Sequence, residues 1–155
     1  MSKGKVLFLH GLSSDGSAKS GFMRSLGYDV LTPNLSDWFF SKAIAQAQAV
    51  YDSFGPDVIV GSSRGGAVAM NLESRDTPLI LLAPAWKQWG NVDRITKPRS
   101  FVIHSMHDEI VPYDDSVSLW VSSTGLELIC AGADHRLNDA EARGMLRFAL
   151  GQVVG

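Results

Sequence analysis

Short apolar runs recur along this chain of 155 residues, each followed by turn residues and then by a longer segment with wider hydrophobic spacing. This alternation is typical of an α/β domain. The runs are continuously apolar and rich in Val, Ile and Leu, as expected for strands of a parallel sheet that is covered on both faces. They span residues 6–9, 28–31, 58–60, 79–82, 101–103 and 126–129. The sequence therefore predicts a sheet of about six parallel strands.

Apolar residues three and four positions apart predict helices between the strands. The clearest one covers residues 142–150. Asn138 and Glu141 resemble a capping box at its start, and Gly151 is expected to end it. Other helices are predicted over residues 18–26, 43–54 and 117–121, and residues 84–100 are the longest segment without a predicted element.

Length and composition narrow the class of protein. A chain of this size is expected to form one domain, residues 1–155. The net charge of −2 argues against a broad binding surface for nucleic acid or anionic membranes. Cys130 is the single cysteine and cannot form an intramolecular disulfide, which indicates a reducing compartment. We therefore expect a cytoplasmic enzyme or binding domain without nucleic-acid or membrane partners; the oligomeric state stays open.

Residues 61–65 read Gly-Ser-Ser-Arg-Gly and match G-x-S-x-G, a sharp strand-to-helix turn that exposes a serine hydroxyl. The five letters alone are weak evidence, since a chance match in this composition is about one in six. The context strengthens them, because a strand is predicted directly before the motif and a helical run directly after it. Gly61 and Gly65 leave space around the turn. Ser63, with glycine at both i−2 and i+2, is the predicted nucleophile.

A serine hydroxyl needs a base that accepts its proton, and the base needs an acid that orients it. His135 follows the last predicted strand and should share the carboxyl edge of the sheet with Ser63, so it is the predicted base. His104 lies in or at the end of the fifth strand and is interpreted as structural. His107 would have to reach Ser63 across the rim, and His10 ends the first strand.

Asp108, a few residues beyond the fifth strand, is the predicted acid. The chain order Ser63, Asp108, His135 is the order found in α/β-hydrolases. A turn-capping role for Asp108 remains open, as does the use of Glu109 or Asp134 as the acid. Asp134 is the weaker alternative, because a residue adjacent to His135 in sequence is poorly placed to contact its ring.

Acyl transfer also needs hydrogen-bond donors for the oxyanion. One is expected to be the backbone N–H of Arg64, directly after the nucleophile. The other should come from the loop of residues 10–16, where Gly11 follows the first strand and Leu12 presents its backbone N–H. The alternative for this loop is an ordinary flexible turn at the end of a strand.

Four segments in the same order together resemble the α/β-hydrolase superfamily, specifically its small bacterial esterase-like members without a cap domain. They are residues 7–11, 61–66, 108–112 and 132–135. The resemblance implies a three-layer αβα sandwich with strand order 2-1-3-4-5-6 and a Ser63-Asp108-His135 triad. It also implies ester or thioester hydrolysis without a metal or cofactor. Two N-terminal strands of the full-size fold are missing and no cap fits, which leaves the substrate class open.

Aromatic residues provide the remaining clue to the substrate. Trp38 follows the second strand and Trp86 lies in the 84–100 segment, so both could wall an apolar pocket at the rim. Covering the flanks of the sheet is an equally good interpretation of both.

The leading function is a serine hydrolase of the carboxylesterase type that acts on small carboxylic esters or thioesters. Amide or C–C bond hydrolysis with the same triad, or non-catalytic binding on a hydrolase fold, are the alternatives. A flavodoxin-like nucleotide binder is disfavoured because residues 10–16 lack the G-x-G-x-x-G pattern.

Overall fold

The computed structural model describes residues 1–12 and 16–154, and this part of the chain forms one six-stranded sheet. The strands run in the order β2-β1-β3-β4-β5-β6, and every neighbouring pair is parallel. Their bounds are β1 Lys5–Leu9, β2 Asp29–Leu31, β3 Val58–Ser62, β4 Leu79–Leu82, β5 Ser100–His104 and β6 Leu126–Cys130. The predicted six parallel strands and their order are confirmed.

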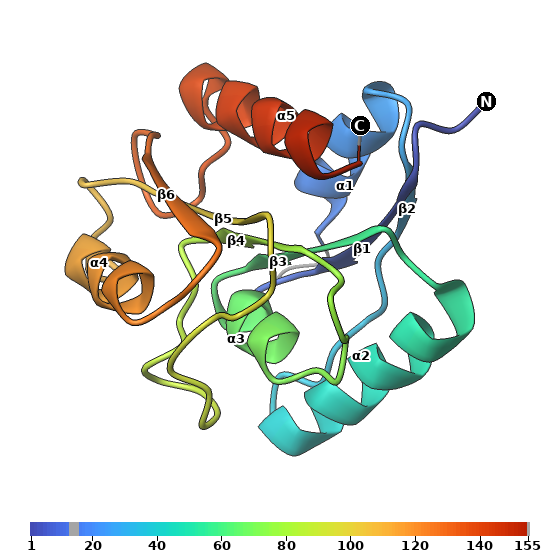
Figure 1. The fold of residues 1–155 in the computed structure, drawn as a ribbon, viewed down its shortest axis with the longest axis horizontal. Helices are drawn as coiled ribbons and strands as arrows, with labels where there is room; N and C mark the ends of the chain where they lie inside the picture. Colours follow the sequence, from blue (N-terminus) through green and yellow to red (C-terminus); the bar gives the residue numbers. More distant parts are fainter. Residues whose placement is uncertain (13–15, 155) are drawn as a thin grey trace.

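Helices cover both faces of the sheet and complete a three-layer αβα sandwich (Figure 1). Helices α1 and α5 lie on one face, and α2, α3 and α4 lie on the other. Their bounds are α1 Ser17–Ser25, α2 Phe40–Phe54, α3 Arg64–Met70, α4 Tyr113–Val121 and α5 Ala140–Val154. Across residues 1–12 and 16–154, none of the helices is both long enough and apolar enough to span a membrane.

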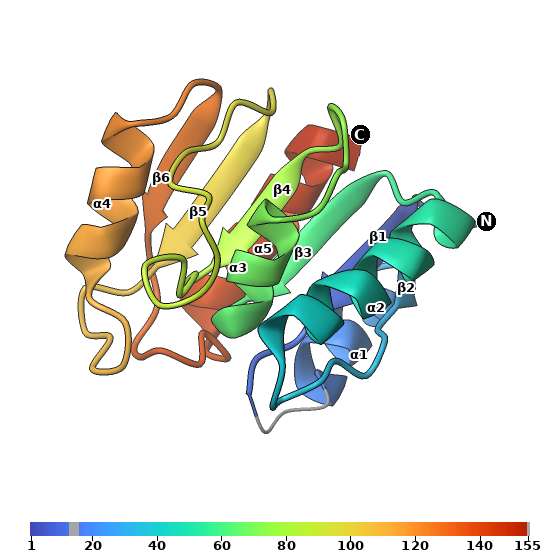
Figure 2. The same ribbon diagram turned by 90° about the horizontal axis from the view of Figure 1, so that it is seen from below.

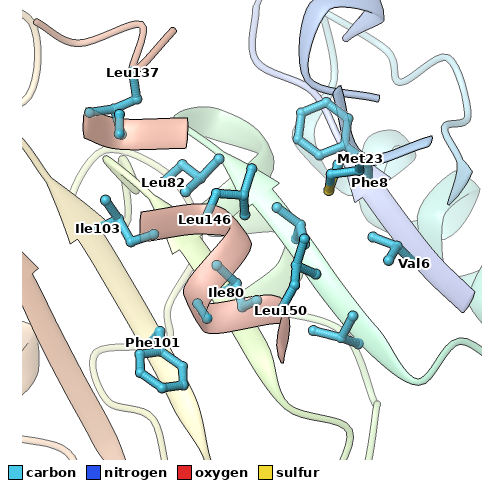
Figure 3. Packing of buried hydrophobic residues seen from close by; sticks show 14 of the residues in the cluster. Val6, Phe8, Met23, Ile80, Leu82, Phe101, Ile103, Leu137, Leu146 and Leu150 are labelled. Atoms are coloured by element: carbon cyan, nitrogen blue, oxygen red, sulfur yellow. The ribbon is translucent and has the colours of Figure 1, made fainter. Parts of the chain in front are cut away.

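Alternating side chains of the strands divide the core into two layers. Val6 and Phe8 of β1 belong to the cluster beneath α1 and α5, where Leu146 also lies (Figure 3). Leu7 and Leu9 belong to the cluster on the opposite face, beneath α2, α3 and α4. These side chains are at most 2 % exposed. Full burial of each contributes about 1.5–3 kcal/mol, which explains why the central strands are apolar at every position.

The connection between β4 and β5 is a loop without a helix or a cap domain. Two of its side chains nevertheless pack into the core on the face of α2, α3 and α4: Ile95 is 3 % exposed, and Trp86 is partly buried against the same cluster. This loop therefore covers part of the sheet where a helix would lie in a regular βαβ unit.

The start of α5 differs from the predicted capping box. Asp139, not Asn138, is the capping residue: its Oδ2 accepts the backbone N–H of Ala142 at 3.2 Å. The carboxylate of Glu141 does not reach back to the cap either, since its Oε1 accepts the N–H of Gly132 at 2.7 Å. The prediction was wrong by one residue because Asp and Asn are about equally good caps, and neighbouring loop contacts decide between them.

The end of α5 was also predicted wrongly. The helix continues through Gly151 to Val154. Val153 is 4 % exposed in the core, and its carbonyl accepts a hydrogen bond of 3.1 Å from Arg99 Nη1. These contacts offset the cost of about 1 kcal/mol for a glycine inside a helix.

All strands are parallel, so their carboxyl ends lie along one edge of the sheet (Figure 2). The chain leaves β1 for β2 on one side and later returns to β3 on the other side of β1. In open α/β sheets, such a switch in direction opens a crevice at the carboxyl ends of the strands. The loops that follow β1, β3, β5 and β6 meet there. Residues 13–15 of the predicted oxyanion loop lie outside the described residues.

Candidate active site

Ser63 occupies the tight turn between β3 and α3. Its backbone has φ 56° and ψ −118°, a region that a residue with a Cβ rarely adopts. Such a conformation costs about 1–3 kcal/mol and persists only where its surroundings hold it. Here the Ser63 N–H donates to the carbonyl of Leu82, and the Ser63 carbonyl accepts the N–H of Ala85, both at 2.9 Å. The strained turn is therefore fixed from β4 and from the segment that follows it.

The glycines around the turn have different surroundings. A Cβ on Gly65 would lie 2.1 Å from the carbonyl oxygen of Leu9, and a Cβ on Gly61 would lie 2.5 Å from that of Gly65. Both positions therefore exclude a side chain. A Cβ on Gly11 would meet Ser63 Cβ at 3.4 Å, an ordinary contact distance. Gly11 thus lies beside the serine, but the space there would also accommodate a Cβ.

The structure brings Ser63, His135 and Asp108 together in one hydrogen-bonded chain. His135 Nε2 lies 3.0 Å from Ser63 Oγ, and His135 Nδ1 lies 2.6 Å from Asp108 Oδ2. Because an ionised carboxylate can only accept, Nδ1 carries the proton and Nε2 is left to accept the serine hydroxyl. The His135 side chain is 19 % exposed and that of Asp108 is fully buried. This arrangement can remove a proton from Ser63.

The Asp108 carboxylate is held on both oxygens. Its Oδ1 accepts the backbone N–H groups of Ile110 at 2.7 Å and Val111 at 2.8 Å. Burial opposes the charge, but the hydrogen bonds from His135, Val111 and Ile110 outweigh it and lower the pKa of Asp108. The carboxylate therefore remains ionised at neutral pH and keeps its orientation toward His135.

The other residues considered for these positions lie elsewhere. Asp134 Oδ1 accepts the N–H of Arg136 at 3.0 Å, so this carboxylate shapes the turn beside the histidine. Glu109 and His107 are exposed at the cavity wall. Among the described residues, none of these side chains forms a hydrogen bond with the ring of His135.

His10 fixes the loop after β1. It is 5 % exposed, its Nε2 accepts the N–H of Leu35 at 3.1 Å, and its Nδ1 donates to the carbonyl of Gly11 at 2.7 Å. The ring thus joins the start of this loop to the segment after β2. Among the described residues, the His10 ring forms no hydrogen bond with the serine.

His104 is fully buried, in keeping with its interpretation as structural, but its ring also reaches the site. Nε2 lies 3.0 Å from Asp108 Oδ2, the oxygen that His135 contacts. The sequence interpretation missed this contact. The available signal was the four-residue spacing from a strand-terminal histidine to an acid in the following turn.

Two backbone N–H groups are available near Ser63. Arg64 begins α3 and Leu12 follows Gly11, and both residues line the same cavity as the serine. Within residues 1–12 and 16–154, neither N–H has a hydrogen-bond acceptor. The Arg64 N–H lies at the start of a helix and the Leu12 N–H lies in a loop. Unpaired N–H groups of either kind can stabilise a developing negative charge.

A cavity of about 930 Å³ opens over the serine. Ser63 and His135 lie in its wall together with the apolar side chains of Leu12, Ile110 and Trp89. Leu12 is 47 % exposed and Ile110 is 65 % exposed. The site thus has a polar centre with exposed apolar groups at its margin.

The two tryptophans predicted as pocket residues do not line this cavity. Trp38 is 88 % exposed, and Trp86 donates from Nε1 to the carbonyl of Asp115 at 3.0 Å while it covers the sheet. Trp89 lies in the cavity wall instead. The sequence could not distinguish these rings, because their positions depend on the path of the loop after β4.

The Arg64 side chain is buried against two aromatic rings. It is 2 % exposed, and its Nε and Nη2 have no hydrogen-bond partner among the described residues. The guanidinium carbon lies 4.8 Å from the ring centre of Trp89 and 5.4 Å from that of Phe40, and these rings stack on one another. Burial lowers the pKa of Arg64, while Asp37 opposes this shift. Contact with the ring faces compensates part of the desolvation of the cation.

Lys19 of α1 ties down the loop that carries His135. Its ammonium donates to the carbonyl of Arg136 and to Asn138 Oδ1, the latter at 3.0 Å. Desolvation and the nearby Arg143 lower the pKa of Lys19 to about 8. The loop therefore has an anchor outside its own residues.

No protein-family model matches the chain, and no curated protein sequence matches it. Solved structures do match. Alpha/beta hydrolase domain-containing protein 10 from mouse superposes with a TM-score of 0.78 at 16 % identity, over 97 % of this chain and 89 % of that one. Est1E from Butyrivibrio proteoclasticus gives a TM-score of 0.77 at 19 % identity, over 97 % and 88 % of the two chains.

The esterase domain of a Rhodothermus marinus protein is a third similar structure. It gives a TM-score of 0.71 at 18 % identity, over 99 % of this chain and 88 % of that domain. With these matches and the observed strand order, the chain has the α/β-hydrolase fold. The fold implied by the sequence motifs is thus confirmed.

Proposed function

We propose that this protein is a serine hydrolase that cleaves small carboxylic esters or thioesters. Ser63 is the nucleophile, His135 the general base and acid, and Asp108 the residue that orients His135. The observation that carries the proposal is the chain of two hydrogen bonds, 3.0 Å and 2.6 Å long, that starts at the strained serine turn. The esterase domain of the Rhodothermus marinus protein supports it, and Est1E, another of the similar structures, has been solved with ferulic acid bound.

Acylation starts when Ser63 Oγ attacks the carbonyl carbon of the substrate and its proton passes to His135 Nε2. The carbonyl electron pair moves onto oxygen, where the N–H groups of Leu12 and Arg64 stabilise it. Each such donor lowers the barrier by about 3–4 kcal/mol. The oxyanion then collapses and breaks the bond to the leaving alcohol or thiol, which takes the proton from His135. An acyl-Ser63 ester remains.

Deacylation repeats these steps with water. His135 accepts a proton from the water as the water oxygen attacks the acyl carbon, and then returns a proton to Ser63 Oγ as the acid product leaves. The Asp108 carboxylate stays ionised throughout and stabilises the imidazolium that forms twice in each cycle.

This chemistry requires neither a metal nor a cofactor. Amide or C–C bond cleavage would use the same three residues and would be recognised by its substrates. A cytoplasmic location is part of the proposal and is supported by the single, exposed and unpaired Cys130.

The test combines fluorophosphonate labelling with hydrolysis of p-nitrophenyl acyl esters of graded chain length. Wild type should be labelled and active, and S63A should be neither. H135A should lose about 10⁴-fold or more in rate. H107A is the matched control, because His107 lines the cavity outside the hydrogen-bonded chain, and it should retain wild-type activity. Equal labelling of wild type and S63A would refute the nucleophile. An unlabelled wild type would favour a non-catalytic binding protein.

A further inference from the structure

The buried imidazole of His104 has a defined set of partners. It lies at the end of β5 with no exposed surface. Its Nε2 is 3.0 Å from Asp108 Oδ2 and 2.9 Å from the carbonyl oxygen of Val111, while its Nδ1 is 2.6 Å from Ser116 Oγ on α4. Both ring nitrogens are thus engaged.

These partners determine the tautomer. The Val111 carbonyl can only accept, so Nε2 of His104 carries a proton and donates. Desolvation lowers the pKa of His104, although the contacts with Val111 and Asp108 oppose the shift. A neutral ring with its proton on Nε2 accepts at Nδ1, and the Ser116 hydroxyl supplies that donor.

The single Nε2–H of His104 is shared between the Val111 carbonyl oxygen and the carboxylate oxygen that His135 uses. Asp108 Oδ2 therefore accepts from two imidazoles, at 3.0 Å and 2.6 Å, while Oδ1 accepts the two backbone N–H groups described above. With four donors around a fully buried carboxylate, neither rotation nor protonation of the group is favourable.

We infer that His104 is a positioning residue of the active site, which acts on His135 through the carboxylate oxygen that the two rings share. This inference rests on the proposed function. His104 keeps Oδ2 in line with His135 Nδ1 and withdraws part of the negative charge from that oxygen. Without this donor, Oδ2 would bind the His135 proton more strongly. The imidazolium would then be favoured at the pH where a neutral base is needed.

The other groups near the ring do not replace this donor. The Tyr113 ring of α4 packs edge-on at 5.6 Å, and Cys130 of β6 is the strand partner of His104. The charged or titratable groups that face His104 are thus Asp108, His135, Tyr113 and Cys130. Among them, only His135 also donates to the shared oxygen.

Two substitutions separate the donor from the volume of the ring. H104N retains a polar group near the position of Nδ1 and can still meet Ser116, but it is too short to reach Asp108. H104Q carries an amide N–H near the position of Nε2 and can restore the donor. H104N should lower kcat toward p-nitrophenyl acetate about 10- to 100-fold with KM nearly unchanged, and should slow fluorophosphonate labelling equally. H104Q should recover most of both rates.

The pH profile distinguishes positioning from a purely structural role. The acidic limb of kcat/KM reports the protonation of His135. It should move to higher pH in H104N and return in H104Q. A structural role would lower the stability of both variants and leave the limb in place. Wild-type kcat and an unchanged limb in H104N would overturn the inference.

A measurement on the wild type covers the case in which H104N does not fold. Imidazole ¹⁵N NMR between about pH 7 and 8 should find His104 neutral with its proton on Nε2. A neutral ring with its proton on Nδ1 instead would overturn the inference. Failure of the proposed function would look different, because S63A would then be labelled as fast as wild type.

Discussion

At the scale of single residues, Gly65 lies where a side chain cannot be accommodated. A Cβ there would lie 2.1 Å from the carbonyl oxygen of Leu9 and 2.5 Å from that of His10, and backbone atoms cannot move aside as a flexible side chain can. We expect G65A to lower the free energy of unfolding by about 3 kcal/mol, the upper range for overpacking. It should also reduce Ser63 labelling, because α3 would shift away from β1. Urea denaturation and labelling rates measure the two effects.

Gly144 provides the matched control. It lies inside α5, and nothing is within 4 Å of the Cβ that alanine would add. G144A should therefore raise the free energy of unfolding by about 0.5–1 kcal/mol, the helix preference of alanine over glycine. If G65A and G144A lost similar amounts of free energy of unfolding, the steric clash at Gly65 would not be the cause of the loss in G65A.

His104 should make stability depend on pH. Its pKa is lowered in the folded protein, mainly by desolvation. As pH falls below about 6.5, the unfolded chain binds a proton at this position before the folded protein does, so the free energy of unfolding decreases. H104Q should flatten this decrease between about pH 6.5 and 5 in urea titrations. The pKa of Asp108 lies below the ordinary 3.8, so protonation of Asp108 changes the free energy of unfolding only at lower pH. Parallel profiles for wild type and H104Q would contradict this assignment.

The residues of the site differ in how well the sequence defined them. Ser63 was predicted from a local pattern of glycines, and the steric requirement at Gly65 is likewise local in sequence. His135 and Asp108 were predicted from chain order, since parallel strands end at one edge. The contact between His104 and Asp108 depends on side-chain directions within a buried turn, and sequence spacing does not determine these.

At the scale of elements, the start of α5 controls the loop that carries His135. Asp139 Oδ2 caps the helix at Ala142, and its Oδ1 accepts the N–H of Ala133 at 3.0 Å. D139A should lower the free energy of unfolding by about 1–2 kcal/mol, as the loss of a helix cap does. It should also reduce kcat, because the loop would lose its connection to the helix.

N138A is the control for this prediction. Asn138 accepts a hydrogen bond from Lys19 and does not cap the helix, so its replacement should change the free energy of unfolding by only about 0.5 kcal/mol. Urea denaturation of both variants compares the two residues directly. If N138A lost more free energy of unfolding than D139A, Asn138 would be the helix cap, as the sequence predicted.

The two ends of α5 show what an element's own sequence leaves undetermined. The apolar spacing predicted the helix, because burial against the sheet requires that period. The start depended on which of two adjacent polar residues faced the helix, and the end depended on the burial of Val153 beyond Gly151. Both are decided by tertiary contacts that outweigh weak local preferences.

At the scale of the whole molecule, the apolar runs predicted the parallel sheet from residues alone. The strand order was available only through the motif resemblance, because pairing between distant strands leaves no local mark in a single sequence. The loop between β4 and β5 was the segment without a predicted element. Its buried Ile95 shows that this loop is part of the core.

No cap domain lies between β4 and β5, and the cavity is walled by loops together with β1, β3 and the starts of α1 and α3, so substrate size should depend on a few wall residues. Trp89 is the largest apolar side chain there. If the proposed function holds, W89A should raise KM for p-nitrophenyl esters of longer acyl chains several-fold and change KM for the acetate little. The reason is that only longer chains bury apolar surface against the ring.

W38A is the matched control, because Trp38 is 88 % exposed and lies outside the cavity wall. It removes the same side chain and should leave KM unchanged at every chain length. W89A also removes the ring that contacts Arg64, so thermal unfolding of both variants must accompany the kinetics. A loss of stability alone would lower the active fraction, and hence the rate, for all esters equally. A rise in KM that grows with chain length in W89A but not in W38A therefore identifies Trp89 as part of the acyl site. Equal chain-length profiles in the two variants would exclude it.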